Sequence, residues 1–188
     1  MSSHHIVREK QEPALLVLGL DNFSDEMLGQ LLEWSPTLIT TPLTAEQVNS
    51  QGIKVDMIIA DEAPADLQSD VRLISAGNSS IKAALDFLLK NDYKAVNIVT
   101  DNVELADFIP YADQINLVIF SGKQKVYPVT PGFSKWKPAG ENIEILSGVD
   151  GLKVTGLELT VDNIYKTLLD GFFTLDFDGG FLFIGEEI

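Results

Sequence analysis

Residues 52–66 read GIKVDMIIADEAPAD, and this segment sets the class of fold that we expect. Residues 57–60 form a short apolar run that predicts a strand, and the chain then enters an acidic loop. Open α/β proteins carry their ligand sites at the carboxyl ends of such strands. The segment therefore predicts a strand that delivers Asp61, Glu62 and Asp66 to a candidate site.

Strand and helix patterns alternate on both sides of this segment, through the first two-thirds of the chain. An unbroken apolar run at residues 14–20 is typical of a strand covered on both faces, and residues 79–91 carry apolar side chains at helical spacing. The other expected strands are 37–40, 71–74, 95–100 and 116–120, and the other expected helices are 24–33, 42–51 and 103–109. This alternation predicts an α/β domain over residues 1–121, with a mostly parallel sheet and flanking helices.

The pattern changes after Gly122, where short apolar runs are separated by Gly, Pro and Asp. The expected strands are 125–128, 142–147, 152–154, 157–161, 165–169, 172–177 and 181–184. Glycine tolerates positive φ, so hairpin turns are predicted at Asp150-Gly151, Asp170-Gly171 and Asp178-Gly179-Gly180, the last pairing 172–177 with 180–184. Residues 122–188 are expected to form a small antiparallel β domain, a sandwich or partial barrel.

Composition limits the partners of the 188-residue chain, which is long enough to bury a core. Its net charge of −15, from 28 acidic and 13 basic residues, argues against nucleic acid and anionic membrane surfaces. The absence of cysteine excludes disulfides, thiolate catalysis and thiolate zinc sites. Residues 1–13 lack the apolar core of a signal peptide, and the first apolar run is too short to span a bilayer, so we expect a cytoplasmic protein.

Several short sequence motifs resemble the thiamin pyrophosphokinase family. Residues 137–147 (KPAGENIEILS) and 151–161 (GLKVTGLELTV) resemble its G-x-x-I-S-L and V-T-T-x-G-L-x-Y-x-L strands, and residues 172–184 resemble its last two strands. Upstream, residues 51–61 (QGIKVDMIIAD) resemble its x-G-I-x-P-D-x-I-I-G-D segment. The resemblance implies a homodimer that transfers a pyrophosphoryl group from ATP to thiamin with Mg²⁺, at a site between the α/β domain of one subunit and the β domain of the other.

The acidic loop departs from the family where the metal site would begin. The family follows its third strand with Gly-Asp-Phe-Asp-Ser, and Asp61 matches the first acid. Ala60, Ala63 and Pro64 stand where the family has the glycine, the second acid and the serine. The loop therefore keeps one of the two carboxylates that the resemblance implies.

Other motifs of the family's site are altered as well. Residues 40–42 (TTP) stand at its Asp-Gly-Gly turn, and residues 75–80 (SAGNSS) stand at its Asp-x-Thr-Asp element. Asp107 matches the acid of its Gly-Gly-Arg-x-Asp-His motif, without the glycines, arginine or histidine. The late Ser-Asn-Glu motif, which contacts thiamin in the family, has no counterpart between Asn163 and Phe173.

The resemblance leaves a small set of candidate site residues. Asp61 and Asp107 are the catalytic candidates, and Asp61, Glu62 and Asp66 are the candidate metal ligands, because Mg²⁺ prefers hard oxygen ligands. Trp136 is the candidate cofactor-binding residue, since its indole can stack on a pyrimidine, although it can equally anchor a dimer interface. The only concentration of basic residues is interpreted as solvated strand edges: Lys123, Lys125, Lys135 and Lys137.

These residues support three hypotheses. The favoured one is a catalytically impaired thiamin pyrophosphokinase-like homodimer, which needs no cofactor. It binds thiamin, another small heteroaromatic ligand or a protein partner, or it only supports structure. The second is an active, divergent thiamin pyrophosphokinase that places Asp61, Glu62 and Asp66 around Mg²⁺ and ATP. The third is a small-ligand-binding module unrelated to thiamin.

Overall fold

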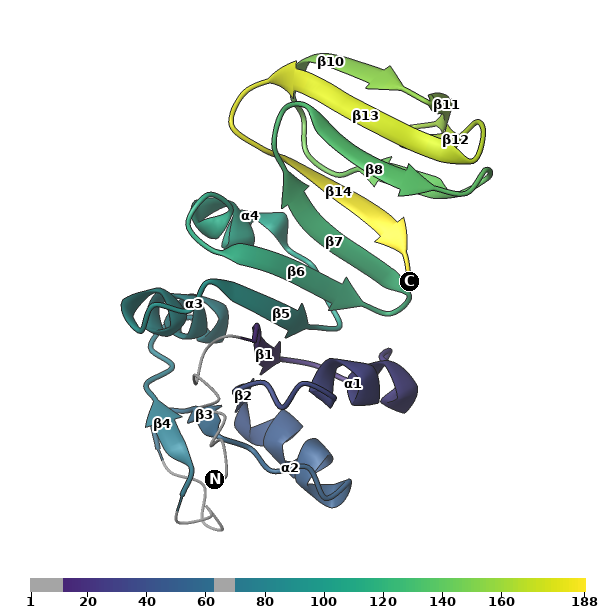
Figure 1. Ribbon diagram of the computed structural model, residues 1–188. Coiled ribbons are helices and arrows are strands. Elements are labelled where there is room, and N and C mark those ends of the chain that lie inside the picture. Colours follow the sequence, from purple (N-terminus) through teal and green to yellow (C-terminus); the bar gives the residue numbers. More distant parts are fainter. Residues whose placement is uncertain (1–11, 63–69) are drawn as a thin grey trace, which may run out of the picture. The chain divides into compact units, whose positions relative to one another are not determined.

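The computed structural model describes residues 12–62 and 70–188, and it divides into two compact units (Figure 1). The first unit ends at Asn116 and the second begins at Leu117. Asp66, Ala63 and Pro64 lie outside the described residues. In the part of the chain that is described, no helix is long and apolar enough to cross a membrane.

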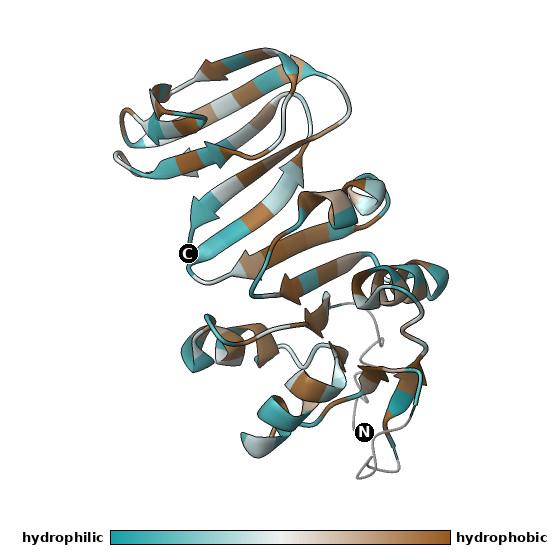
Figure 2. Cartoon of the chain, turned by 180° about the vertical axis from the view of Figure 1, so that it is seen from behind, coloured by the Kyte–Doolittle hydropathy of each residue, from teal (hydrophilic) through white to brown (hydrophobic). Residues whose placement is uncertain are grey.

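The first unit contains a parallel sheet in the order β5-β1-β2-β3-β4. Its strands are β1 (Ala14–Val17), β2 (Leu38–Thr40), β3 (Met57–Ile59), β4 (Arg72–Ile74) and β5 (Ala95–Val99). All four residues of β1 are buried, and hydrophobic residues dominate the central strands (Figure 2). Strands that are covered on both faces are expected to be this uniformly apolar.

Helices cover the two faces of this sheet. Helices α1 (Asp25–Leu32) and α2 (Pro42–Ser50) lie on one side, and α3 (Ser80–Lys90) lies on the other (Figure 1). Helix α3 buries three small or apolar residues along one face: Ala84, Leu85 and Leu88. A short helix α4 (Leu105–Phe108) and a 3₁₀ turn η1 (Ile109–Tyr111) follow β5.

The second unit consists of two antiparallel sheets. The larger sheet has the order β11-β12-β9-β14-β7-β6 within this unit, and the smaller has the order β10-β13-β8. The strands of the larger sheet are β6 (Asn116–Ser121), β7 (Gln124–Val129), β9 (Asn142–Ile145), β11 (Leu157–Val161), β12 (Ile164–Thr167) and β14 (Leu182–Glu187). Those of the smaller sheet are β8 (Phe133–Lys137), β10 (Asp150–Thr155) and β13 (Gly171–Asp178).

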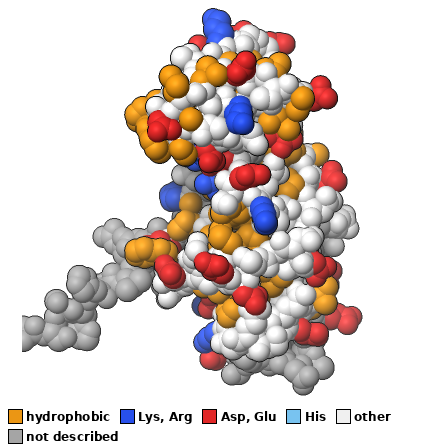
Figure 3. Space-filling view, turned by 90° about the vertical axis from the view of Figure 1, so that its right-hand side faces the viewer, with side chains coloured by type: hydrophobic (Ala, Val, Ile, Leu, Met, Phe, Trp, Pro, Cys, Tyr) orange, Lys and Arg blue, Asp and Glu red, His pale blue; other side chains and the backbone are white. Residues whose placement is uncertain are grey.

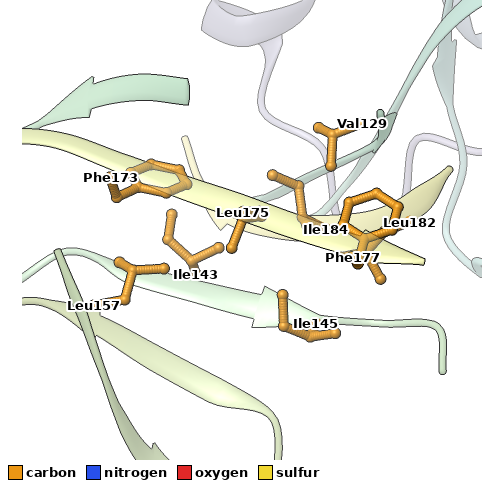
Figure 4. Close-up of a cluster of buried hydrophobic side chains, with 9 residues drawn as sticks. All are labelled: Val129, Ile143, Ile145, Leu157, Phe173, Leu175, Phe177, Leu182 and Ile184. Atoms are coloured by element: carbon orange, nitrogen blue, oxygen red, sulfur yellow. The ribbon is translucent and has the colours of Figure 1, made fainter. Parts of the chain in front are cut away.

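A buried apolar cluster joins the two sheets into a sandwich (Figure 4). On β13 every second side chain is buried: Phe173, Leu175 and Phe177. Leu182 and Ile184 of β14 meet them from the other sheet, together with residues of β7, β9 and β11. An α/β region followed by an antiparallel β region, as the sequence predicts, is therefore confirmed.

The three predicted hairpin turns are wrong. β13 pairs with β10 and β8, whereas β14 pairs with β7 and β9, so the Asp178-Gly179-Gly180 turn carries the chain from one sheet to the other. The Asp170-Gly171 turn makes the opposite crossing, from β12 to β13. Gly151 lies inside β10, at a shift in register with β13. Each glycine eases a sharp change in backbone direction, but burial of apolar faces on both sheets determines which strands pair.

Strand β8 was not among the predicted strands. Its sequence, FSKWK, mixes two aromatic and two lysine side chains, and its alternate residues are half-buried and exposed. The register places Trp136 of β8 opposite Phe172 of β13, and Lys135 opposite Phe173. Partnership with the central strand β13, rather than the hydropathy of β8 itself, holds this edge strand in the sheet.

Candidate functional site

Asp61 and Glu62, the described start of the acidic loop, follow the carboxyl end of β3 in the parallel sheet, as the sequence predicts. Ala60 continues from β3, with its backbone N–H donating to the Ile74 carbonyl at 2.9 Å, and Asp61 and Glu62 follow. Both acidic side chains are exposed. The third predicted metal ligand, Asp66, lies outside the described residues.

Asp61 is held by donors from the loop that follows β4. The Ser75 hydroxyl donates to Asp61 Oδ1 at 2.7 Å, and the backbone N–H of Gly77 donates to the same oxygen at 3.3 Å. Gly77 has φ +55°, a conformation that glycine adopts without steric cost. The Ser75 hydroxyl, followed by the Gly77 amide, lowers the pKa of Asp61 below its usual value. Asp61 is therefore a charged group that ties the β3 and β4 loops together.

A metal site at this edge would take its charged ligands from Asp61, Glu62 and Asp66, of which Asp66 lies outside the described residues. Mg²⁺ takes near-octahedral oxygen coordination and commonly keeps several waters beside one or two carboxylates. Among residues 12–62 and 70–188, no group of three or more His, Cys, Asp or Glu side chains is placed to hold a metal ion. Hydrogen bonds to one oxygen of Asp61 leave the other able to bind a metal, so the metal role of Asp61, Glu62 and Asp66 stays a prediction.

Neighbouring strand ends carry hydroxyl groups that cap helices. Thr41 caps α2 in a reciprocal arrangement, in which the Thr41 N–H donates to Thr44 Oγ1 at 2.9 Å and the Thr44 N–H donates back to Thr41 Oγ1. The buried Thr44 hydroxyl also donates to the Val17 carbonyl at 2.8 Å. Ser79 caps α3 through the Lys82 N–H. Both strand ends therefore carry neutral caps that order the helix starts, and Thr41 stands at the first glycine of the Asp-Gly-Gly turn that the resemblance implies.

Asp101, at the end of β5, is an acidic residue that the sequence reasoning missed. Its Oδ1 accepts from the Asn22 N–H at 3.1 Å, and a Cβ on Gly19 would overlap its carboxylate. β1 and β5 flank the point where the strand order reverses, which is where open α/β sheets usually bind ligands. An acid directly after the predicted strand at 95–100 was the available clue, of the same kind that identified Asp61.

Asp107 does not join Asp61. It lies exposed on α4, where its backbone N–H donates to the Glu104 carbonyl at 3.0 Å. α4 follows β5, and β1 and β2 separate β5 from β3 in the sheet. Three strand spacings correspond to about 14 Å. A catalytic role for Asp107 stays a prediction, and it would act at a different point of the edge from Asp61.

Trp136 lies on β8 in the second unit, where its side chain is 53% exposed. Its register partner Phe172 is 69% exposed. The two aromatic side chains stand on the outer face of the smaller sheet, because their strand neighbours Phe173 and Lys135 face inward. The pair offers an accessible aromatic surface, and the cofactor-binding role of Trp136 remains a prediction.

The interpretation of the lysines as solvated strand edges is wrong for three of the four. Lys125, Lys135 and Lys137 contact Glu186 of β14, whose side chain is 1% exposed. Lys125 Nζ lies 3.0 Å from Oε1 and Lys137 Nζ lies 2.9 Å from Oε2. Only the pairing of β7 with β14, and the packing of β8 over them, brings these residues together, so spacing in the sequence could not reveal the cluster. Lys123 is exposed, as expected.

Burial and the lysines shift the pKa of Glu186 in opposite directions. Burial by itself would raise the pKa of this carboxyl, but the bonds from Lys135, Lys137 and Lys125 outweigh it and lower the pKa to about 2. The Tyr127 hydroxyl donates to Glu186 Oε1 at 3.1 Å, and burial, with Glu186 second, raises the pKa of Tyr127. Glu186 is therefore an ionised carboxylate at neutral pH, with a protonated phenol beside it.

Comparison with known proteins identifies solved structures that share this architecture. No family model matches the sequence, and no curated protein matches it either. Solved structures do match: a parallel α/β sheet followed in the chain by an antiparallel sandwich is the fold of a class of pyrophosphokinases.

The fold is that of the thiamin pyrophosphokinases. The enzyme from Bacillus subtilis is 14% identical, with a TM-score of 0.64 over 94% of this chain and 99% of that one. The enzyme from Geobacillus thermodenitrificans is 14% identical, with a TM-score of 0.68 over 93% and 97%. The enzyme from Candida albicans is 10% identical, with a TM-score of 0.66 over 94% and 89%. The predicted resemblance is thereby confirmed for the fold.

Proposed function

We propose that this chain is a thiamin pyrophosphokinase-like binding protein in which metal-dependent pyrophosphoryl transfer is lost or strongly impaired. The observation that carries the proposal is that, among residues 12–62 and 70–188, no group of three or more His, Cys, Asp or Glu side chains could hold a metal ion, while Asp61 Oδ1 accepts from the Ser75 hydroxyl and the Gly77 amide. In this arrangement the carboxylate serves the loops of its own sheet. The neutral caps at Thr41 and Ser79 support the same view, because they order helix starts within segments 40–42 and 75–80, which lack the carboxylates of the family's motifs.

The chemistry of the transfer explains why this arrangement matters. Phosphoryl-type transfer depends on positioning and on neutralising charge, with Mg²⁺ bridging phosphate oxygens. A threonine or serine hydroxyl is neutral and gives the metal no charge compensation. Asp61 would give Mg²⁺ one charged ligand through its second oxygen, whereas the resemblance implies several carboxylates around the metal. Mg²⁺ and ATP would therefore be cofactors only of the alternative, an active divergent kinase.

The proposal includes a ligand and a second copy of the chain. Trp136 and Phe172 give a stacking surface for thiamin or another small heteroaromatic ring. The same exposed aromatic pair suits the interface of a homodimer, because large aromatic side chains dominate interface energetics. Light scattering of purified protein tests the dimer, and a Trp136→Ala variant separates its two roles: lost thiamin binding with an unchanged mass supports the ligand role.

A thermal-shift panel with a product assay tests the function. We expect thiamin to raise the melting temperature without Mg²⁺-ATP, because a ligand that binds only the native state must stabilise it. We expect no thiamin-dependent release of AMP from ATP. AMP release that disappears in Asp61→Asn and persists in Asp107→Asn would overturn the proposal and establish the kinase. No shift with thiamin or its phosphates would favour a binding module unrelated to thiamin.

A further inference from the structure

We propose that the second unit binds a small organic anion in a pocket beside the Glu186–lysine cluster, defined as Glu186, Lys125, Lys135, Lys137 and Tyr127. The ligand class is a planar apolar body that carries one carboxylate or phosphate group. The proposal uses residues of the second unit alone, so it holds whether or not the proposed function above is correct.

The cluster lies at the margin of the sandwich core. Glu186 is two residues beyond Ile184 on β14, so both side chains leave the same face of the strand, and Ile184 belongs to the buried cluster. Lys125 is the register partner of Glu186 on β7, whereas Lys135 and Lys137 come from β8 of the other sheet. The polar cluster therefore links the two sheets where their apolar packing ends.

Positive charge exceeds negative charge in this cluster. Three ammonium groups face Glu186, and Lys137 also lies 3.7 Å from Glu141 Oε2. Two carboxylates thus oppose three ammonium groups, which leaves one positive charge. The excess falls on Lys125 and Lys135, since Lys137 lies between both carboxylates. It occurs in a chain with a net charge of −15, and acidic side chains are spread over the face seen in Figure 3.

The two lysines with the excess charge line a pocket of about 330 Å³. The other lining residues are Val118, Tyr127, Phe133 and Ser134. This volume is at the lower end of the range for small-molecule sites, of about 300–1,000 Å³. Val118 and the rings of Tyr127 and Phe133 form an apolar wall, so a ligand with only a charged group would leave that wall unused.

The ammonium groups of Lys125 and Lys135 lie close to the Tyr127 ring, at the pocket wall. Lys125 Nζ and Lys135 Nζ lie 5.5 and 5.4 Å from the ring centroid, within cation–π range. Lys135 also donates to the Tyr127 hydroxyl at 3.2 Å. Burial lowers the pKa of Lys135 despite its contact with Glu186. A second anion in the pocket would compensate this partly desolvated ammonium group.

Calorimetric titration of the full chain with four probes tests the pocket: phenyl phosphate, benzoate, inorganic phosphate and phenol. We expect phenyl phosphate or benzoate to bind at least tenfold more tightly than phenol or inorganic phosphate, and the tighter of the two names the acidic group. We expect added sodium chloride to weaken binding, because the lysines are partly exposed. Equal binding of phenol would overturn the charged half of the proposal, and equal binding of inorganic phosphate would overturn the apolar half.

Matched lysine variants test whether the probe binds at this pocket. We expect Lys135→Met to weaken the tighter probe at least tenfold, while Lys153→Met, at an exposed lysine on β10, leaves it unchanged. Glu186 keeps Lys125 and Lys137 in the first variant, and Lys125→Gln serves if that variant does not fold. Amide chemical-shift changes of the unmodified chain should centre on Val118 and Ser134. Absence of binding by every probe, or equal loss in the Lys153 variant, would overturn the proposal.

Discussion

Asp61 in the first unit and Glu186 in the second are both carboxylates with lowered pKa values, but different interactions hold them. Asp61 is exposed, and neutral donors from the adjacent loop bind one of its oxygens. Glu186 is buried, and three ammonium groups surround it. The hydrogen bonds of an exposed acid order the loop that donates them. Its charge adds little to stability, because water screens it. A buried acid has to be paired, and the groups that pair it create a charged site of their own.

The largest expected effect is that of Glu186→Gln. The glutamine keeps the shape of the side chain but leaves three ammonium groups without their shared counter-ion. We expect the free energy of unfolding to fall by about 3 kcal/mol, near the lower end for a broken buried pair. The lower end applies because the side chains of Lys125 and Lys135 are about a third exposed (31% and 32%). Urea denaturation measures the loss.

Glu187→Gln is the matched control for that variant. Glu187 is the next residue of β14 and is exposed. We expect this substitution to change the free energy of unfolding by less than about 0.5 kcal/mol, as for most surface substitutions. Equal losses in the two variants would mean that β14 responds to any lost charge, and the contrast between buried and exposed acids would then fail.

A smaller effect should appear as the pH is lowered. The pKa of Glu186 falls from 4.5 to about 2 on folding, so its ionised form stabilises the native state above pH 4.5. That contribution is lost as the pH falls from 4.5 through 2. The difference in unfolding free energy between the unmodified chain and Glu186→Gln should therefore be constant above pH 5 and shrink toward pH 2. Urea titrations at several pH values measure it, and a difference independent of pH would contradict the assignment.

The smallest effect is expected for Ser75→Ala. The Ser75 hydroxyl is the largest cause of the lowered pKa of Asp61. Without this hydroxyl, the pKa should rise toward its usual value of 3.8. Stability should change less than in Glu186→Gln, because water replaces the lost donor. Carbon-13 NMR titration of the Asp61 carboxyl measures the pKa. Ser50→Ala, at an exposed serine that bonds only to the Gln47 carbonyl, is the control and should leave the Asp61 pKa unchanged.

The two charged groups also differ in how far the sequence revealed them. Asp61 could be predicted because an acid directly after a short apolar strand has a fixed place in an open α/β sheet. Its partners Ser75 and Gly77 lie 14 and 16 residues away, and the register of β3 with β4 brings them within reach. Glu186 is 61 residues from Lys125 and 51 from Lys135 in the sequence, and neither its burial nor its partners follow from local pattern.

The sequence by itself determined the class of fold and, apart from β8, the order of its main elements. Apolar runs of strand length, helix spacing at 79–91 and the change of pattern after Gly122 are local properties, and they set the parallel sheet and the β sandwich. The tertiary structure alone decided which strands pair across the Asp-Gly turns, and it placed β8 and gathered the lysines on Glu186. Sheet pairing and burial depend on contacts between distant residues, because a strand's partners are chosen by the faces that the whole fold can bury.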